Sequence, residues 1–334
     1  MRKVGVAVVG VGTMGQRHAE NLCRAVPEAR LVAVVDTDRT RVGQVAAALE
    51  VEAYDDIEPV LNHKDIQAVV IASPAKFHAA GIQAAAACGK DILCEKPIAL
   101  TLEEADASLA AVSKAGVRLQ IGHMRRYDPA YGDAKRRIEA GEIGEPVIFK
   151  AIGRDREPPP LGYFRSGLNG MLFLDSSLHE FDLARWLMSD EIIEVQAYGG
   201  VLVFPELAQC NDIDAGVVNL RFSRGALGNV ESFRQARYGY DIRTEIVGSK
   251  GTLMVGTLDR TPQRVLTSDG ARRDEVGDYL ERFADAYREE IRDFVQSLLS
   301  DRPPRVTGAD GRRALAVALA AERSYREARP LSLV

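Results

Sequence analysis

The stretch Val4-Gly-Val-Ala-Val-Val-Gly10-Val-Gly-Thr-Met-Gly15 decides the fold of this chain. Its valines alternate with small residues, which indicates a buried strand of a parallel sheet that runs directly into a glycine-rich turn and a helix. Gly10 allows the tight turn, Gly12 lets the backbone approach a pyrophosphate, and Gly15 lets the helix pack closely against the strand. Free N–H groups at the helix start favour phosphate binding. The predicted dinucleotide-binding residues of this loop are Gly10, Gly12, Thr13, Met14 and Gly15.

The second predicted strand, residues 31–35, ends on an acidic residue. Asp36 follows Gly15 by about 20 residues, the spacing at which a carboxylate accepts hydrogen bonds from the ribose hydroxyls of adenosine. Such a carboxylate repels a 2′-phosphate, so the sequence predicts NAD in preference to NADP. Arg39 and Arg41 are close enough in sequence to soften that preference. A βαβ unit without a ligand is the alternative interpretation.

Length and composition indicate an ordinary globular protein with two domains. The chain has 334 residues, of which 46% are hydrophobic and 27% charged, and it contains no apolar run long enough to span a bilayer, so no membrane association is expected. A net charge of −5, with scattered basic residues, argues against nucleic acid as a partner. The first strand begins within a few residues of Met1, which leaves no room for a signal peptide and predicts a cytoplasmic protein.

The four cysteines carry no metal or redox motif. Cys23, Cys88, Cys94 and Cys210 show no Cys-x-x-Cys spacing and sit mostly in apolar segments. We therefore expect buried free thiols in a reducing compartment.

Strands and helices alternate over the first 122 residues. This alternation predicts an N-terminal Rossmann domain, a doubly wound parallel sheet, over residues 1–122. Further strands are expected at 51–54, 66–72, 92–94 and 117–122, and helices at 38–49, 57–61, 78–87 and 101–115.

The pattern changes in residues 123–334. Long runs with one apolar and one polar face predict a C-terminal α+β domain with a predominantly antiparallel open sheet. Strands are expected at 147–152, 191–204, 214–222, 226–234, 242–247 and 252–255, and helices at 128–140, 176–188, 279–299 and 309–328.

Polar residues follow the predicted strands of the parallel sheet, at the carboxyl ends where such sheets bind ligands. They are Ser73-Pro74, Glu95-Lys96-Pro97 and the segment from Gly122 to Arg126. Lys96 lies between a buried strand and a proline, so we expect its ammonium to point into the cleft and not to be a plain surface charge. The further cofactor-binding residues predicted here are Ser73, Pro74, His78, Glu95 and Lys96.

A second polar cluster consists of Asp175, His179 and Asp182. Spacings of four and three residues place these side chains on one stripe of a helix, or on its first turn and body. Two acids and an imidazole on a largely apolar helix are costly to bury without a ligand or partner. A histidine beside a carboxylate can take a hydroxyl proton near neutral pH, although a structural histidine remains an alternative. No second histidine or cysteine stands at ligand spacing, so no metal is expected.

These motifs resemble the glucose–fructose oxidoreductase/inositol dehydrogenase (Gfo/Idh/MocA) family. The resemblance rests on Gly10–Gly15, Asp36, Glu95-Lys96-Pro97 and Gly-Met-Leu-Phe-Leu-Asp175-Ser-Ser-Leu-His179-Glu-Phe-Asp182, and it covers nearly the whole chain. It implies a Rossmann domain followed by a sheet-rich domain that forms a homo-oligomer, a tetramer or a dimer, through its open face. The family's catalytic lysine, aspartate and histidine correspond to Lys96, Asp175 and His179.

Segments of the second half are similar to the inositol 2-dehydrogenase branch of that family. They are Met124-Arg125-Arg126-Tyr-Asp-Pro129, Tyr238-Gly-Tyr240-Asp241 and Glu245-Ile-Val-Gly248. The chain departs from the pattern at His123, at Leu168-Asn-Gly170 and at Arg154-Asp155. At the positions of Arg154 and Asp155, some inositol dehydrogenases carry a His and an Asn that touch substrate. The expected contacts for the hydroxyls of a small polyol or sugar are Arg125, Asp155, Asp182 and Tyr240.

The resemblance implies NAD-dependent oxidation of a secondary hydroxyl of a cyclitol to a ketone, with myo-inositol as the expected substrate. Alternatives are dehydrogenases of scyllo-inositol, glucose or a related pyranose, and family members that act on sugar-nucleotide intermediates. A regulator that binds NAD without turnover is an alternative of a different class. Such a regulator needs no acid–base set, so Lys96, Asp175 and His179 argue against it.

Overall fold

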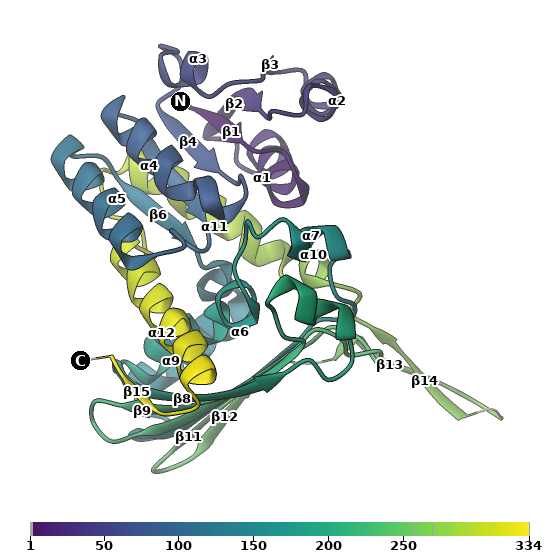
Figure 1. Ribbon diagram of the computed structural model, residues 1–334. Coiled ribbons are helices and arrows are strands. Elements are labelled where there is room, and N and C mark those ends of the chain that lie inside the picture. The colour runs from purple at the N-terminus through teal and green to yellow at the C-terminus, as the bar shows by residue number, and fades with distance from the viewer. Residues whose placement is uncertain (1–2, 257, 269, 334) are drawn as a thin grey trace. The chain divides into compact units, whose positions relative to one another are not determined.

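The computed structural model describes residues 3–256, 258–268 and 270–333, and the chain folds into two compact units (Figure 1). Unit 1 contains Met1–Tyr127 and Asp285–Leu315, and unit 2 contains Asp128–Ala284 and Ala316–Val334. Each unit has its own sheet and is described separately.

Unit 1 is built on a six-stranded sheet in the order β3-β2-β1-β4-β5-β6, and all neighbouring strands are parallel. This order reverses direction at β1, which confirms the predicted doubly wound Rossmann sheet. The strands are β1 (Val4–Val9), β2 (Ala29–Val35), β3 (Glu52–Tyr54), β4 (Ala68–Ile71), β5 (Asp91–Glu95) and β6 (Leu119–Gly122).

The helices of unit 1 that begin at Arg39 and Leu102 have side-chain caps. The Asp38 carboxylate accepts from the N–H groups of Thr40 and Arg41, and the Thr101 hydroxyl accepts from that of Glu104. The elements are α1 (Thr13–Arg24), α2 (Arg39–Leu49), α3 (Glu58–Leu61), η1 (Ala75–Phe77), α4 (His78–Ala87), α5 (Leu102–Ala115) and η2 (Met124–Tyr127).

A helix from far along the chain completes the core of unit 1. In α11 (Ala284–Leu299), Ile291, Phe294 and Val295 are buried in the same apolar cluster as the valines of β1. The predicted division at residue 122 treats each domain as one continuous stretch. The compact units differ from it because α11 buries its apolar face against the Rossmann sheet.

Unit 2 contains a seven-stranded sheet in the order β12-β11-β7-β10-β9-β8-β15. Its neighbours are antiparallel except for β7 and β10, which run parallel, so the sheet is mostly antiparallel as predicted. The strands are β7 (Pro146–Arg154), β8 (Ile192–Gly200), β9 (Ala215–Phe222), β10 (Leu227–Phe233), β11 (Asp241–Gly248), β12 (Thr252–Val255) and β15 (Leu331–Ser332).

The two faces of this sheet have different surroundings. Helices α6 (Pro129–Glu139) and α9 (Leu178–Met188) lie on one face, where α9 packs on β7 and β10 (Figure 1). On the other face, large apolar side chains that share one side of paired strands are exposed to solvent. They are Ile148, Tyr198, Val217, Leu227 and Met254.

Several elements of unit 2 and of the chain's end differ from the predictions. The helix expected at 176–188 is α9, which begins at Leu178, and a short helix that was not predicted, α8 (Leu172–Asp175), precedes it. The helix expected at 279–299 is two helices, α10 (Tyr279–Arg282) and α11. Other elements that were not predicted are α7 (Leu161–Arg165), η3 (Pro205–Cys210), β15 and the hairpin of β13 (Asp259–Thr267) and β14 (Gly270–Glu275), whereas α12 (Gly308–Glu327) matches its prediction.

The thiols and the helices bear on two further predictions. All four cysteines are free, and Cys94 is buried, but Cys23 and Cys88 are exposed, so the prediction of buried thiols is wrong for those two. Cys23 is on the outer face of α1, and Cys88 follows the last turn of α4. Among the described residues, no helix combines the length and apolarity needed to cross a bilayer.

Candidate active site

The glycine loop between β1 and α1 has the shape that a dinucleotide requires. Gly10 has a φ of +84°, and a Cβ there would lie 2.6 Å from the backbone nitrogen of Ser73. A Cβ on Gly15 would lie 1.7 Å from the carbonyl oxygen of Gly10, so helix and strand touch there. A Cβ on Gly12 would meet nothing within 4 Å. Gly12 therefore leaves open space at the start of α1, where helix N–H groups without helical partners can bind a pyrophosphate.

Asp36 directly follows β2, beside this loop. Its Oδ2 accepts a hydrogen bond from the N–H of Val11 at 2.9 Å, and its Oδ1 accepts from the N–H of Asp38 at 2.9 Å. The guanidinium of Arg41 lies 3.2 Å from Oδ2, whereas Arg39 pairs with Asp55. The carboxylate thus fixes the glycine loop, and Arg41 is the one of the two predicted arginines that contacts it.

His78, at the start of α4, lies between the turns that follow β4 and β5. Its Nδ1 is 2.6 Å from the carbonyl oxygen of Pro97, and its Nε2 is 2.7 Å from that of Ser73. Burial lowers the pKa of His78, against the two carbonyls, which favour its protonated form. The imidazole joins two strand-end turns that the sequence predicted as separate parts of the cofactor site.

Glu95 is buried and holds the turn that carries Lys96. Its Oε1 lies 2.6 Å from Nε2 of His18 on α1, and its Oε2 accepts from the N–H of Lys96 at 3.2 Å. Burial pushes the pKa of Glu95 upward, but the hydrogen bond and charge of His18, with the nearby Lys96 ammonium, bring it below its usual value. The Lys96 side chain is half-buried.

Glu290 of α11 approaches the same pair. His18, Glu95 and Glu290 are buried, and one ligand atom from each lies within 4.8 Å of the others. Neither carboxylate oxygen of Glu290 has a hydrogen-bond partner among the described residues. Burial, together with Glu95 and Asp293, raises the pKa of Glu290 well above its usual value, which favours its neutral form.

In unit 2, the predicted Asp175–His179–Asp182 cluster lies on two helices and not on one. Asp175 is the last residue of α8, whereas His179 and Asp182 belong to α9. Ser176 and Ser177 separate the two helices, so Asp175 does not continue the stripe of α9. Asp175 and His179 are half-buried, and Asp182 is 2% exposed.

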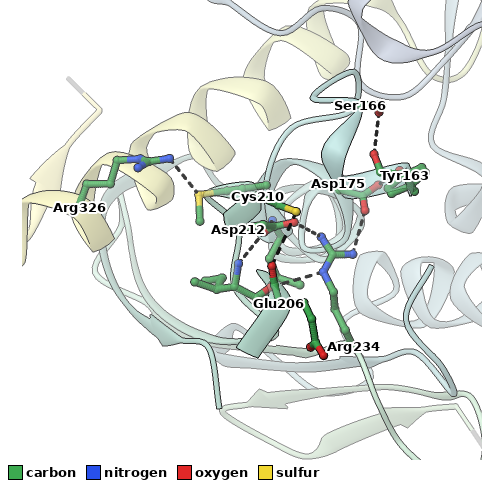
Figure 2. A network of polar contacts seen from close by, with 11 residues as sticks. Tyr163, Ser166, Asp175, Glu206, Cys210, Asp212, Arg234 and Arg326 are labelled. Atoms are coloured by element: carbon green, nitrogen blue, oxygen red, sulfur yellow. Dashed lines mark hydrogen bonds and ion pairs between the residues drawn. The ribbon is translucent and has the colours of Figure 1, made fainter. Parts of the chain in front are cut away.

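Asp175 is held by two side chains that the sequence analysis did not identify (Figure 2). Its Oδ1 accepts a hydrogen bond from the Tyr163 hydroxyl at 2.8 Å, and its Oδ2 accepts from Nη1 of Arg234 at 3.0 Å. Nη2 of Arg234 donates to Asp212 at 3.0 Å. The local sequence gives no signal for this network, because Arg234 follows β10 and its partners Asp212 and Asp175 lie 22 and 59 residues away in the chain.

The residues predicted to contact substrate come from different elements. Arg125 lies in η2 of unit 1 and is 4% exposed. In unit 2, Asp155 directly follows β7. Its N–H donates to the carbonyl oxygen of Phe233 at 2.9 Å, so Asp155 lies beside the residue that precedes Arg234. Tyr240 is buried before β11, with its ring edge-on to Phe283.

Comparison with known families accounts for both units. Residues 4–123 match a family model described as an oxidoreductase family with an NAD-binding Rossmann fold. Residues 131–254 match the GFO/IDH/MocA C-terminal domain. The chain belongs to the Gfo/Idh/MocA oxidoreductase family. It is an NAD-dependent oxidoreductase, and the predicted cofactor and family are confirmed.

Members of the Gfo/Idh/MocA family with assigned substrates align with nearly the whole chain. The scyllo-inositol 2-dehydrogenase (NAD(+)) of Bacillus subtilis is 40% identical, over 99% of this chain and 96% of that protein. The myo-inositol 2-dehydrogenase of Thermotoga maritima is 38% identical, over 98% of each chain. The crystal structure of scyllo-inositol dehydrogenase from Lactobacillus casei with bound NAD(H) and scyllo-inositol superposes with a TM-score of 0.94 at 28% identity, covering 99% of each chain.

Proposed function

We propose that this oxidoreductase is an inositol 2-dehydrogenase that oxidises a secondary hydroxyl of a cyclitol to a ketone, with myo-inositol as the expected substrate. The observation that carries the proposal is the full-length similarity to inositol 2-dehydrogenases in a chain that keeps Lys96, Asp175 and His179. Bound NAD would accept the hydride, as nicotinamide cofactors do. The protein's own contribution is to orient the hydroxyl and remove its proton.

Each proposed catalytic residue has a distinct role. His179 accepts the hydroxyl proton, and Asp175 supports the charge that His179 then carries. Lys96 donates a hydrogen bond to the reacting oxygen, from a turn that Glu95 and His18 hold in place. The Glu95 contact keeps the backbone of Lys96 fixed, which limits the positions that its ammonium can reach.

The proposed cofactor contacts follow from the loop geometry of unit 1. The open space at Gly12 and the N–H groups of Thr13 and Met14 suit the pyrophosphate, and Asp36 suits the adenosine ribose. The strand-end turns joined by His78 suit the nicotinamide half. The proposed cofactor residues are Gly10, Gly12, Thr13, Met14, Gly15, Asp36, Ser73, Pro74, His78, Glu95 and Lys96.

The proposed substrate contacts are Arg125, Asp155, Asp182 and Tyr240. A polyol offers many hydroxyls and little apolar surface, so charged and phenolic groups are appropriate partners. Sites that hydrogen-bond hydroxyls reject analogues that lack them strongly, because the protein groups are left without partners. Deoxy or O-methyl inositols should therefore lose kcat/KM steeply.

A polyol panel tests this proposal. Formation of NADH is followed with myo-inositol, scyllo-inositol, glucose and small aliphatic alcohols. We expect oxidation of myo-inositol at the highest kcat/KM, with weaker activity on glucose. Similarity to a scyllo-inositol enzyme makes scyllo-inositol the second candidate. Oxidation of aliphatic alcohols alone would contradict the cyclitol assignment, and NAD binding with no oxidation of any compound would favour a regulator.

We also propose a cytoplasmic homo-oligomer, a tetramer or a dimer, formed through the open sheet face of unit 2. Apolar side chains that lie together on an exposed sheet face favour protein contacts. Sedimentation equilibrium of the wild type should give a mass above the 36.4 kDa of one chain. A Tyr198→Asp, Met254→Asp variant should shift the equilibrium toward monomer, because both side chains are exposed on that face.

A further inference from the structure

We propose that Arg234 is the positioning residue of the catalytic carboxylate, holding Asp175 through a fork whose other prong is anchored on Asp212. This inference rests on the proposed function, because it takes Asp175 to support His179 during proton transfer. It assigns a role in positioning Asp175 to three residues of unit 2, Arg234, Asp212 and Tyr163.

The position of Arg234 fits such a role better than a surface ion pair. Its side chain is 1% exposed, and its guanidinium carbon stands 4.7 Å from the centre of the Phe164 ring. Its Nη1 and Nη2 each donate at 3.0 Å to a different carboxylate, of Asp175 and Asp212 (Figure 2). A planar guanidinium with two fixed prongs sets both the distance and the direction of the carboxylates it binds.

Asp212 fixes the same helical turn at its other end. Its Oδ1 accepts from the N–H of Leu172, the first residue of α8, at 2.8 Å. It therefore caps the helix start, where N–H groups lack helical partners. Asp175 is the last residue of α8. Asp212 therefore restrains Asp175 in two ways, through the backbone of α8 at Leu172 and through the side chain of Arg234.

Tyr163 completes the restraint on Asp175. With Tyr163 on Oδ1 and Arg234 on Oδ2, both carboxylate oxygens have a donor, so rotation of the group would break at least one bond. A carboxylate fixed in this way keeps its orientation through the catalytic cycle, and misplacement of a reacting group by about 1 Å can cost about 100-fold in rate.

The charges of the network also bear on proton transfer. One cation, Arg234, lies between Asp175 and Asp212, and Asp155 is close enough to influence it. Burial raises the pKa of Asp212 even though Arg234 opposes this. Although burial disfavours its charge, Asp175 and Asp212 raise the pKa of Arg234, so it stays a cation. The described ionisable groups of the network are Asp155, Tyr163, Asp175, Asp212 and Arg234, and His179 is the proposed proton acceptor that Asp175 supports.

The experiment measures kcat, KM for myo-inositol and NAD affinity from about pH 5 to pH 10 in four variants, Arg234→Met, Arg234→Lys, Asp212→Asn and the control Arg185→Met. Arg234→Met removes a cation, so the acid limb of the kcat profile should move up by about one pH unit, and kcat should fall about 10- to 100-fold. Asp212→Asn removes an anion, so the acid limb should move down. Arg234→Lys keeps the charge without the fork, so its acid limb should stay near the wild type while kcat remains low.

The control separates this role from general loss of a buried arginine. Arg185 is 6% exposed and donates to both oxygens of one carboxylate, Glu191, at 2.6 and 2.8 Å. Arg185→Met should keep the wild-type pH profile. NAD affinity should be unchanged in all four variants, because the proposed cofactor residues belong to unit 1.

The outcomes distinguish the inference from the proposed function. Wild-type protein that oxidises no polyol overturns the proposed function and the inference with it. An active wild type whose kcat profile is unmoved in Arg234→Met overturns the inference alone. If Arg234→Met does not fold, the other two network variants still test the inference. It is overturned if Arg234→Lys and Asp212→Asn both keep the wild-type kcat and the wild-type acid limb.

Discussion

The Asp36 carboxylate accepts a hydrogen bond from the N–H of Val11, in the middle of the glycine loop, at 2.9 Å. Asp36 therefore has two effects that can be separated, since its charge repels a 2′-phosphate and its oxygen holds the loop. Asp36→Asn removes the charge but keeps an acceptor, whereas Asp36→Ala removes both. We expect both variants to reduce the preference for NAD over NADP. Only Asp36→Ala should also lower the binding affinity for both cofactors. Cofactor titrations followed by fluorescence measure this.

A wild-type kcat/KM with NADP equal to or above that with NAD would show that Asp36 does not set the cofactor preference. Arg39→Ala is the matched control for nearby charge. Arg39 pairs with Asp55, while Arg41 contacts Asp36, so Arg39→Ala should leave the preference unchanged.

The glycines of the loop should differ in what their substitution damages. A Cβ on Gly15 would lie 1.7 Å from the carbonyl oxygen of Gly10, which forces α1 away from β1 and should cost about 3 kcal/mol or more of folding stability. A Cβ on Gly12 meets nothing within 4 Å, so Gly12→Ala should keep the wild-type Tm and lose NAD affinity. Thermal unfolding with and without NAD measures both effects. Equal loss of Tm in the two variants would contradict this division.

The Rossmann half was predictable because its signals are local. A valine strand, glycines at fixed spacing and Asp36 at the next strand end are short-range features, and Asp38 and Thr101 stand where helices start. The core of unit 1 was not predictable in full, because α11 reaches it from more than half the chain away. Its amphipathic pattern shows that it buries one face, but not against which sheet.

Unit 2 shows a second limit of local patterns. Asp175 and His179 are four residues apart, which suggests one helix, yet α8 ends at Asp175 and α9 starts at Leu178. The hydrogen bonds that Asp175 receives from Tyr163 and Arg234 restrain a residue that the pattern assigned to a continuous helix. Such tertiary contacts carry no periodic signal in the sequence.

His179→Ala should lower kcat about 100- to 10,000-fold, the usual cost of losing a positioned general base. NAD affinity should remain near the wild type, because the proposed contacts to the cofactor are in unit 1. Steady-state kinetics with myo-inositol and fluorescence titration with NAD separate the two quantities. His63→Ala is the matched control, since His63 is a histidine of unit 1 outside the proposed site. Turnover within a few-fold of wild type would exclude His179 from the mechanism.

Glu290 should make stability depend on pH in a direction opposite to that of an ion-paired carboxylate. Burial, with Glu95 and Asp293 nearby, raises the pKa of Glu290 well above the usual 4.5. At a pH between these two pKa values, the folded protein keeps a proton on Glu290 that the unfolded chain has released. The stability from neutral Glu290 is complete below pH 4.5 and is lost as the pH rises through the raised pKa. The contribution of Glu290 to the free energy of unfolding of the wild type should therefore decrease as the pH rises above 4.5.

Glu290→Gln keeps the shape of the side chain and cannot ionise, so it should lack this contribution. The free energies of unfolding of wild type and variant, from urea titrations between about pH 5 and pH 8, should diverge in favour of the variant as the pH rises. The neighbouring Glu289 is half-buried and pairs with Arg292, so Glu289→Gln should show no such divergence. A difference between wild type and Glu290→Gln that is the same at every pH would mean that Glu290 is ionised in the folded protein, with a cation or water beside it. That result would replace the neutral acid with a charged group next to the Glu95-Lys96 turn.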